Sequence, residues 1–234
     1  MGAHSIRSAF EYNGQKCSAC SRLYVPDTLW PELKAKLLDA AAQVKVGQPD
    51  DPTVLVTAVI TEASFDKIQR YIEGARASPT ETILFGGQCD KRQGYFIQPT
   101  IIETTNPRSP TMTDELFGPV LTVFVYPARD YEGALRLCDE SVPYGLTGAL
   151  FATDRHAIEL GSRLLRNAAG NFYINDKSTG AVVGQQAFGG ARLSGTNDKS
   201  GSLQHLIRWV SPRVIKENFV PLSGFTYPSN LPDA

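Results

Sequence analysis

The stretch LTVFVY, Leu121–Tyr126, indicates the fold class of this sequence. Apart from Thr122 it is apolar or aromatic, without the alternation of polar and apolar residues that marks a half-exposed strand. Such a run is typical of a strand buried on both faces, as in parallel sheets that are covered by helices. It therefore predicts a central strand of a mainly parallel sheet.

Helical and strand-like segments alternate on both sides of this stretch. Five segments have helical periodicity: His4–Asn13, Thr28–Val44, Ser64–Ala77, Tyr131–Asp139 and His156–Leu165. The first of them ends at Asn13-Gly14, and Ser64 is the expected N-cap of the third. Five more segments read as strands: Ser21–Val25, Thr82–Phe85, Thr100–Glu103, Thr147–Phe151 and Ala169–Ile174. The alternation predicts an α/β fold with a doubly wound, mainly parallel sheet and helices on both faces.

The chain changes character near its C-terminus. Trp209–Lys216 looks strand-like, and a Pro/Ser/Asn-rich segment follows from Pro221 to Ala234. We therefore expect one α/β domain over residues 1–207 and a C-terminal extension over 208–234 that contacts partner chains.

Composition argues against several classes of protein. With 23 Lys and Arg against 24 Asp and Glu, the chain has no basic excess for binding nucleic acid or an anionic membrane. None of its apolar runs is long enough to span a bilayer. Four cysteines in 234 residues do not form a disulfide framework, which favours a reducing compartment.

The stretch GQKCSACSRLYV, Gly14–Val25, places two cysteines three residues apart. A redox pair needs its first sulfur at a helix N-terminus, but here a predicted helix precedes Cys17 and a strand follows Cys20. A zinc site needs a second ligand pair, and the other cysteines and histidines are scattered: Cys89, Cys138, His4, His156 and His205. Two interpretations of Cys17 stay open, a reactive nucleophile or a small structural residue; Cys20 and Cys138 are interpreted as structural.

Five motifs occur in one order along the chain: GQKC (Gly14–Cys17), ELFGPV (Glu115–Val120), PYGLTG (Pro143–Gly148), NFYIN (Asn171–Asn175) and FGGARLSG (Phe188–Gly195). Together they resemble the catalytic part of the aldehyde dehydrogenase family. Two longer stretches, Phe10–Arg22 and Asn171–Arg192, are similar to one group within it, the mitochondrial delta-1-pyrroline-5-carboxylate dehydrogenases. Those enzymes oxidise glutamate gamma-semialdehyde to glutamate in proline catabolism.

The resemblance implies roles for residues at the first two motifs. Cys17 matches the nucleophile that attacks the aldehyde carbon, and its backbone N–H would help to hold the oxyanion. Glu115 and Phe117 match contacts to the ribose and the ring of the nicotinamide in NAD. Without the other motifs, the same two residues would read as a tight turn with an aromatic residue packed beneath it, and Lys16 as a solvated neighbour.

The resemblance also implies a substrate site. Ser18, Gly180 and Ala181 match positions that hold the far carboxylate of the substrate, although relatives often carry Ser in place of Ala181. Phe188 matches an aromatic wall around the methylene chain, and the glycine-rich loop after it is expected to fold over Cys17. On composition alone, Phe188 reads as a core residue and the glycines of this loop as turn residues.

The same resemblance implies an NAD-binding domain, a glutamate base and an asparagine oxyanion donor in a region that precedes the matched segment. Only sixteen residues precede Cys17, so we expect an incomplete NAD site and little turnover by this chain alone. It implies the mitochondrial matrix and a homo-oligomer, with a small aldehyde as substrate and neither nucleic acid nor membrane as partner. The alternative is a non-catalytic truncated product that associates with full-length subunits.

Overall fold

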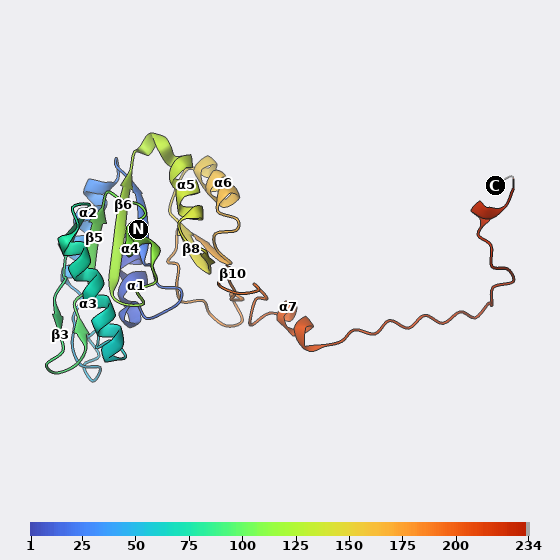
Figure 1. Cartoon of the computed structure of the whole chain (residues 1–234), viewed down its shortest axis with the longest axis horizontal. Helices are drawn as coiled ribbons and strands as arrows, with labels where there is room; N and C mark the ends of the chain where they lie inside the picture. The colour runs from blue at the N-terminus through green and yellow to red at the C-terminus, as the bar shows by residue number, and fades with distance from the viewer. Residues whose placement is uncertain (233–234) are drawn as a thin grey trace.

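A four-stranded sheet forms the centre of the molecule in the computed structural model, which describes residues 1–232 (Figure 1). Its strand order is β1-β6-β5-β2, with bounds Arg22–Pro26, Val120–Tyr126, Thr100–Thr104 and Glu81–Phe85. Strands β1, β6 and β5 run parallel, whereas β2 pairs antiparallel with β5. The prediction that Leu121–Tyr126 is an inner strand is confirmed, and Leu121 and Val123 are fully buried in it.

Helices cover both faces of this sheet because its strands are apolar on both faces. Helices α1 (Gly2–Phe10) and α2 (Trp30–Ala42) pack with Ile101 and Leu121 in one core cluster. Helix α3 (Glu62–Ala77) packs with Ile102 and Val120 in a second cluster. Adjacent residues of one strand thus enter opposite cores, as the two-residue period of a strand requires. The predicted doubly wound, mainly parallel α/β fold is confirmed.

Two details at the helix starts differ from the predictions. Helix α3 begins at Glu62, and its N-cap is Thr61, whose side chain accepts a hydrogen bond from the Ser64 backbone N–H at 3.1 Å, so the assignment of Ser64 as the cap was wrong. Helix α2 begins at Trp30 rather than Thr28. Trp30 is buried where its indole N–H can donate to Glu103 at 3.0 Å, which leaves Leu29 exposed.

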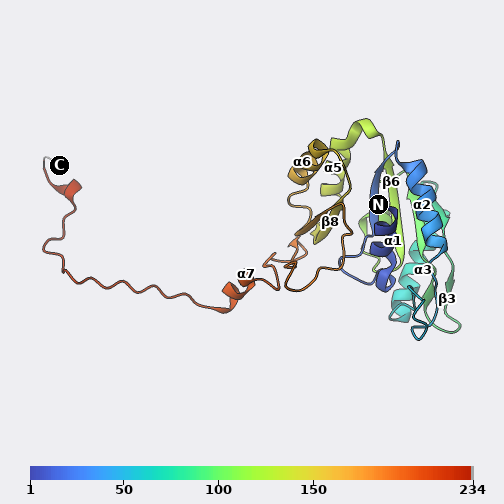
Figure 2. The ribbon, with the colours of Figure 1, turned by 180° about the vertical axis from the view of Figure 1, so that it is seen from behind.

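The second half of the chain forms a smaller layer beside the main sheet (Figure 2). Strands β8 (Thr147–Leu150) and β9 (Asn171–Ile174) make a separate parallel pair, next to helices α5 (Tyr131–Glu140) and α6 (Arg155–Leu164). The remaining elements are short, and the sequence analysis did not separate them from loops: η1 Glu11–Gly14, β3 Cys89–Asp90, β4 Phe96–Ile97, α4 Pro110–Thr113, η2 Ala128–Asp130, β7 Tyr144–Gly145, β10 Ala191–Arg192, α7 Leu203–Leu206, η3 Ile207–Trp209 and η4 Pro228–Asn230.

Beyond η3 the chain runs away from both sheets as an extended, exposed segment (Figure 1). The predicted strand over Trp209–Lys216 was wrong, because no strand among residues 1–232 pairs with this segment, and strand preference depends on such partners. The boundary between residues 207 and 208 stays a prediction. None of the helices in residues 1–232 is both long and apolar enough to cross a membrane.

Candidate active site

The turn that carries Cys17 is fixed by the end of helix α1. After Phe10 the chain enters η1, where Asn13 has a positive φ of 60°. The Asn13 side chain donates to the Ala58 carbonyl and accepts from the Thr57 backbone N–H, each at 2.7 Å. This buried amide therefore anchors the turn to a distant loop, and Cys17 follows four residues later on a surface turn.

Gly14 brings this turn against the ELFGPV loop. Its φ of +65° lies in the left-handed region, and a Cβ at this position would lie 2.2 Å from the Gly118 carbonyl oxygen. Only glycine allows the two backbones to approach so closely. The close contact places GQKC and ELFGPV, about a hundred residues apart in sequence, side by side.

Helix α3 and a buried leucine hold the ELFGPV loop in place. Lys67 donates to the Glu115 carbonyl oxygen at 3.1 Å, and Leu116 is buried. Phe117 has a φ of 58° and keeps 42% of its surface exposed. A small cavity of about 70 Å³ is lined by Cys17, Glu115 and Phe117 together. The structure therefore brings these three predicted residues together.

Cys17 differs from the other three cysteines, all of which are free thiols. It is exposed, whereas Cys20, Cys89 and Cys138 are partly buried. Burial raises the pKa of Cys20 and of Cys89 to about 11, and it raises the pKa of Cys138 as well. The Cys17 backbone N–H donates to no acceptor within residues 1–232. Accessibility and an available N–H are what a thiol nucleophile with its own oxyanion donor needs.

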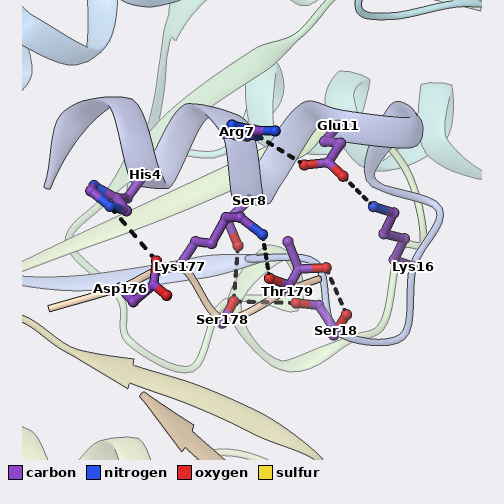
Figure 3. A network of polar contacts seen from close by, with 10 residues as sticks. All are labelled: His4, Arg7, Ser8, Glu11, Lys16, Ser18, Asp176, Lys177, Ser178 and Thr179. Atoms are coloured by element: carbon purple, nitrogen blue, oxygen red, sulfur yellow. Dashed lines mark hydrogen bonds and ion pairs between the residues drawn. The ribbon is translucent and has the colours of Figure 1, made fainter. Parts of the chain in front are cut away.

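A chain of buried hydroxyls joins the Cys17 turn to the segment after β9 (Figure 3). The Ser8 and Ser178 hydroxyls lie 2.9 Å apart, and Ser178 donates to the Ser18 carbonyl oxygen at 3.2 Å. The Ser18 and Thr179 hydroxyls lie 2.7 Å apart. These hydrogen bonds fix Thr179, and with it Gly180, beside the residue that follows Cys17.

Gly180 has a φ of +84°, a conformation that favours glycine. The Gly180 and Ala181 backbone N–H groups find no acceptor within the part of the chain that is described, and Lys177 donates to the Thr179 carbonyl oxygen at 2.6 Å beside them. The loop thus combines two available N–H donors with a nearby ammonium group. The Ser18 hydroxyl is buried against Thr179, and it can still donate outward when Thr179 is the donor of their shared hydrogen bond.

Phe188 lies on a loop that Asn171 holds. The Asn171 side chain donates to the Ala187 carbonyl at 3.0 Å and accepts from the Gly189 N–H at 3.1 Å. Phe188 itself pairs with Ser200 through a backbone hydrogen bond of 2.9 Å. It is absent from the lining of both described cavities that Cys17 borders. Its contact with substrate, and the closure of its loop over Cys17, stay predictions.

Lys16 is paired rather than free. It lies 2.5 Å from the Glu11 carboxylate and lowers the pKa of Glu11 through this hydrogen bond. Sequence reasoning gave no role to Ser8, Ser178 or Thr179, whose hydroxyls brace the site. Two of them lie inside the stretch Asn171–Arg192, but their partners are more than 150 residues away in sequence, so only the fold reveals the pairing. Within residues 1–232, no three His, Cys, Asp or Glu side chains are grouped to hold a metal ion.

A family model described as "Aldehyde dehydrogenase family" matches residues 2–214. The chain is 57% identical over 225 residues to the mitochondrial delta-1-pyrroline-5-carboxylate dehydrogenase of Dictyostelium discoideum, covering 96% of this chain and 40% of the relative. It is 54% identical to the Homo sapiens protein of the same name, covering 95% of this chain and 40% of that protein. The chain therefore spans about two fifths of the length of these curated relatives.

A solved structure of a relative with the same enzyme name has a similar fold. The crystal structure of the delta-pyrroline-5-carboxylate dehydrogenase from Mycobacterium tuberculosis bound with NAD superposes with a TM-score of 0.83 at 44% identity. The match covers 98% of this chain and 42% of that one.

Proposed function

Because the chain belongs to the aldehyde dehydrogenase family, we propose that Cys17 is the nucleophile of an NAD-dependent oxidation of glutamate gamma-semialdehyde to glutamate. The observation that carries this proposal is the position of Cys17, the exposed thiol, between Glu115 and Phe117 on one side and the Ser18–Thr179 contact on the other. The names and identities of the relatives support the same substrate.

The proposed chemistry begins at the Cys17 sulfur. The thiolate adds to the aldehyde carbon, a C–S bond forms, and the carbonyl oxygen becomes an oxyanion to which the Cys17 backbone N–H donates. The carbon then loses a hydride and the adduct becomes a thioester. Water adds to the thioester, the C–S bond breaks, and the carboxylic acid leaves with the thiolate restored.

NAD accepts the hydride when it is bound. The residues described here fit part of such a cofactor: the Phe117 ring is exposed for stacking, and the Glu115 carboxylate can accept hydrogen bonds from ribose hydroxyls beside Cys17. The crystal structure of the Mycobacterium tuberculosis relative bound with NAD supports this assignment.

We assign the far carboxylate of the substrate to the Gly180–Ala181 loop. Its two available N–H groups and the Ser18 hydroxyl would donate to the carboxylate, and the charge of Lys177 would favour an anion there. The proposal extends to Phe188 as a wall for the methylene chain. The names of the relatives support a mitochondrial location. We further propose that residues 1–207 form the catalytic unit and that residues 208–234 form an arm for oligomer contacts.

The test is the rate of NADH formation from glutamate gamma-semialdehyde, measured on a chimaera in which residues 1–234 replace the matched region of the Dictyostelium discoideum relative, because little turnover is expected from this chain alone. Cys17→Ser is expected to lose activity by at least about 10³-fold, since a hydroxyl is a far weaker nucleophile than a thiolate. Cys20→Ser serves as the matched control and should retain most of the activity. Equal rates for the wild type and Cys17→Ser would refute the assignment, and activity lost only in Cys20→Ser would transfer the role to Cys20.

A further inference from the structure

Lys199 follows the FGGARLSG motif in sequence, and its side chain reaches back to that motif. Its ammonium group donates to the Gly170 carbonyl, to the Gly189 carbonyl at 3.4 Å and to the Asn171 side-chain oxygen at 3.4 Å. The backbones it joins lie in contact, since a Cβ on Gly170 would come within 1.9 Å of the Gly189 carbonyl oxygen. An ammonium group has three N–H donors and no acceptor, so these three acceptors satisfy it.

The position of Lys199 is unfavourable for a lysine on its own. Burial lowers its pKa, and no charged neighbour among the described residues contributes to this shift. Its backbone has a φ of 57°, a conformation that is uncommon for a residue with a Cβ. The Ser202 hydroxyl holds that backbone by donating to the Lys199 carbonyl oxygen at 2.6 Å. A charge without an ionic partner on a strained backbone indicates that the surrounding structure needs its contacts.

The acceptors of Lys199 belong to the structure that holds Phe188. The Asn171 side chain accepts from the Gly189 N–H at 3.1 Å and donates to the Ala187 carbonyl at 3.0 Å. Lys199 donates to the same Asn171 oxygen and to the Gly189 carbonyl. The Phe188 N–H donates at 2.9 Å to the carbonyl of the residue after Lys199. The peptide groups on both sides of Phe188 are therefore fixed by Asn171 and Lys199 together.

Lys199 also determines the orientation of the Asn171 amide. Because an ammonium group can only donate, the oxygen of this amide must face it and the NH₂ group must face the other way. With the amide turned round, its NH₂ group would meet the ammonium and the Gly189 N–H, and its oxygen would meet the Ala187 carbonyl. All three of these hydrogen bonds would then be lost.

We propose that Lys199 is a positioning residue that holds Phe188 against the methylene chain of glutamate gamma-semialdehyde. This inference rests on the proposed function, because it explains how the wall assigned there to Phe188 is kept in place. Lys199 acts through Asn171 and the two peptide groups that flank Phe188, and it takes no part in the reaction itself.

The expected kinetic effect of losing this contact is a change in KM with little change in kcat. The two methylene groups of the substrate do not react, so a wall beside them contributes equally to the bound substrate and to the transition state. Displacing the wall therefore raises KM alone. Acetaldehyde has no such methylene chain, and its kcat/KM should stay unchanged.

The experiment compares Lys199→Met with Lys36→Met in the chimaera that carries residues 1–234. Methionine keeps an unbranched apolar chain and removes the ammonium group. In Lys199→Met, KM for the semialdehyde should rise about tenfold, the effect of losing the burial of about two methylene groups. Lys36 lies exposed on α2 beside Glu32, so the same chemical change there should leave the kinetics with both aldehydes unchanged.

Hydrogen exchange gives a second measurement that needs no activity. In the 234-residue chain, the Gly189 amide should exchange about tenfold faster in Lys199→Met than in Lys36→Met, because Asn171 loses the donor that orients its oxygen. Equal exchange rates, measured by NMR, would overturn the inference whether or not the chimaera is active. A failure of the proposed function is seen separately, as equal NADH formation by the wild type and Cys17→Ser.

Two kinetic results would also overturn the inference. Lys199→Met could unfold cooperatively in urea, as a folded protein does, and still keep the wild-type KM. It could also lower kcat/KM for both aldehydes by the same factor, which would indicate a general structural defect.

If Lys199→Met does not fold, Lys199→Arg decides the question. Arginine keeps the charge, but its planar guanidinium cannot present one nitrogen to three acceptors. This variant should raise KM for the semialdehyde by about threefold or more and leave acetaldehyde oxidation unchanged. In that case, a wild-type KM in Lys199→Arg would show that the contact does not position Phe188.

Discussion

Gly14→Ala tests whether the close contact between the Cys17 turn and the ELFGPV loop holds the site together. The change adds one methyl group at a φ of +65°, where it would lie 2.2 Å from the Gly118 carbonyl oxygen and 2.8 Å from the Ala9 carbonyl oxygen. Both neighbours are backbone atoms, so a side-chain rotation cannot relieve the overlap. The turn or the ELFGPV loop must move.

The loss of stability has two terms. The left-handed conformation costs a residue with a Cβ about 1–2 kcal/mol. Overpacking against backbone costs about 1–3 kcal/mol more. The free energy of unfolding should therefore fall by about 2–5 kcal/mol, which lowers the urea midpoint by about 1–2 M for a chain of this size.

Urea unfolding of the purified chain measures this effect, and Gly74→Ala is the matched control. Gly74 lies in helix α3 with open space where a Cβ would be, so the same chemical change there should stabilise the helix by about 0.5–1 kcal/mol. The two variants are thus expected to move the midpoint in opposite directions. A Gly14→Ala midpoint within experimental error of the wild type would refute the close contact.

Three further results are expected. Iodoacetamide should modify Cys17 before Cys20, because only the former is exposed, and peptide mapping that finds Cys20 modified first would contradict the site. Burial raises the pKa of Cys20 and Cys89 from 9.0 to about 11, so above pH 9 these thiols stay protonated in the folded chain while they ionise in the unfolded chain. The free energy of unfolding, measured with urea, should therefore fall between about pH 9 and 11. A free energy that does not change over this pH range would count against the burial of both thiols. Ser178→Ala should cost about 1–3 kcal/mol by leaving the buried Ser8 hydroxyl unpaired, and Ser8→Ala should cost less, because the Ser178 hydroxyl still donates to the Ser18 carbonyl. The double variant should cost less than the sum, and strict additivity would argue against the hydrogen bond between the two serines.

The sequence predicts the main sheet well because burial leaves a local signature there. Leu121–Tyr126 is apolar on both faces because helices cover both faces of the sheet, and this pattern can be recognised in the sequence alone. The antiparallel pairing of β2 leaves no such signature, because strand direction depends on which distant strand it meets. The wrong prediction of a strand over Trp209–Lys216 has the same cause: its residues favour a strand, but in the described part of the chain no other strand pairs with them.

The candidate site shows a similar division. The ordered motifs pointed to Cys17, Glu115 and Phe117, and the structure places all three around one small cavity. The hydroxyl pair of Ser8 and Ser178 could not be predicted, because serine is common at both kinds of position and the two residues are 170 positions apart. For Phe188 the sequence predicted a role that the structure does not test. Asn171 anchors its loop, but Phe188 lines neither of the described cavities that Cys17 borders.

The buried amide of Asn13 has a consequence for the chemical ageing of the protein. An asparagine followed by glycine is prone to deamidation, in which the next backbone nitrogen attacks the side-chain carbonyl and ammonia leaves. Here the amide nitrogen donates to Ala58 and the oxygen accepts from Thr57, so the group is held away from the geometry of that attack. Partial unfolding of this turn would expose Asn13-Gly14 to irreversible damage, and the resulting carboxylate would face the Ala58 carbonyl and prevent the turn from closing again.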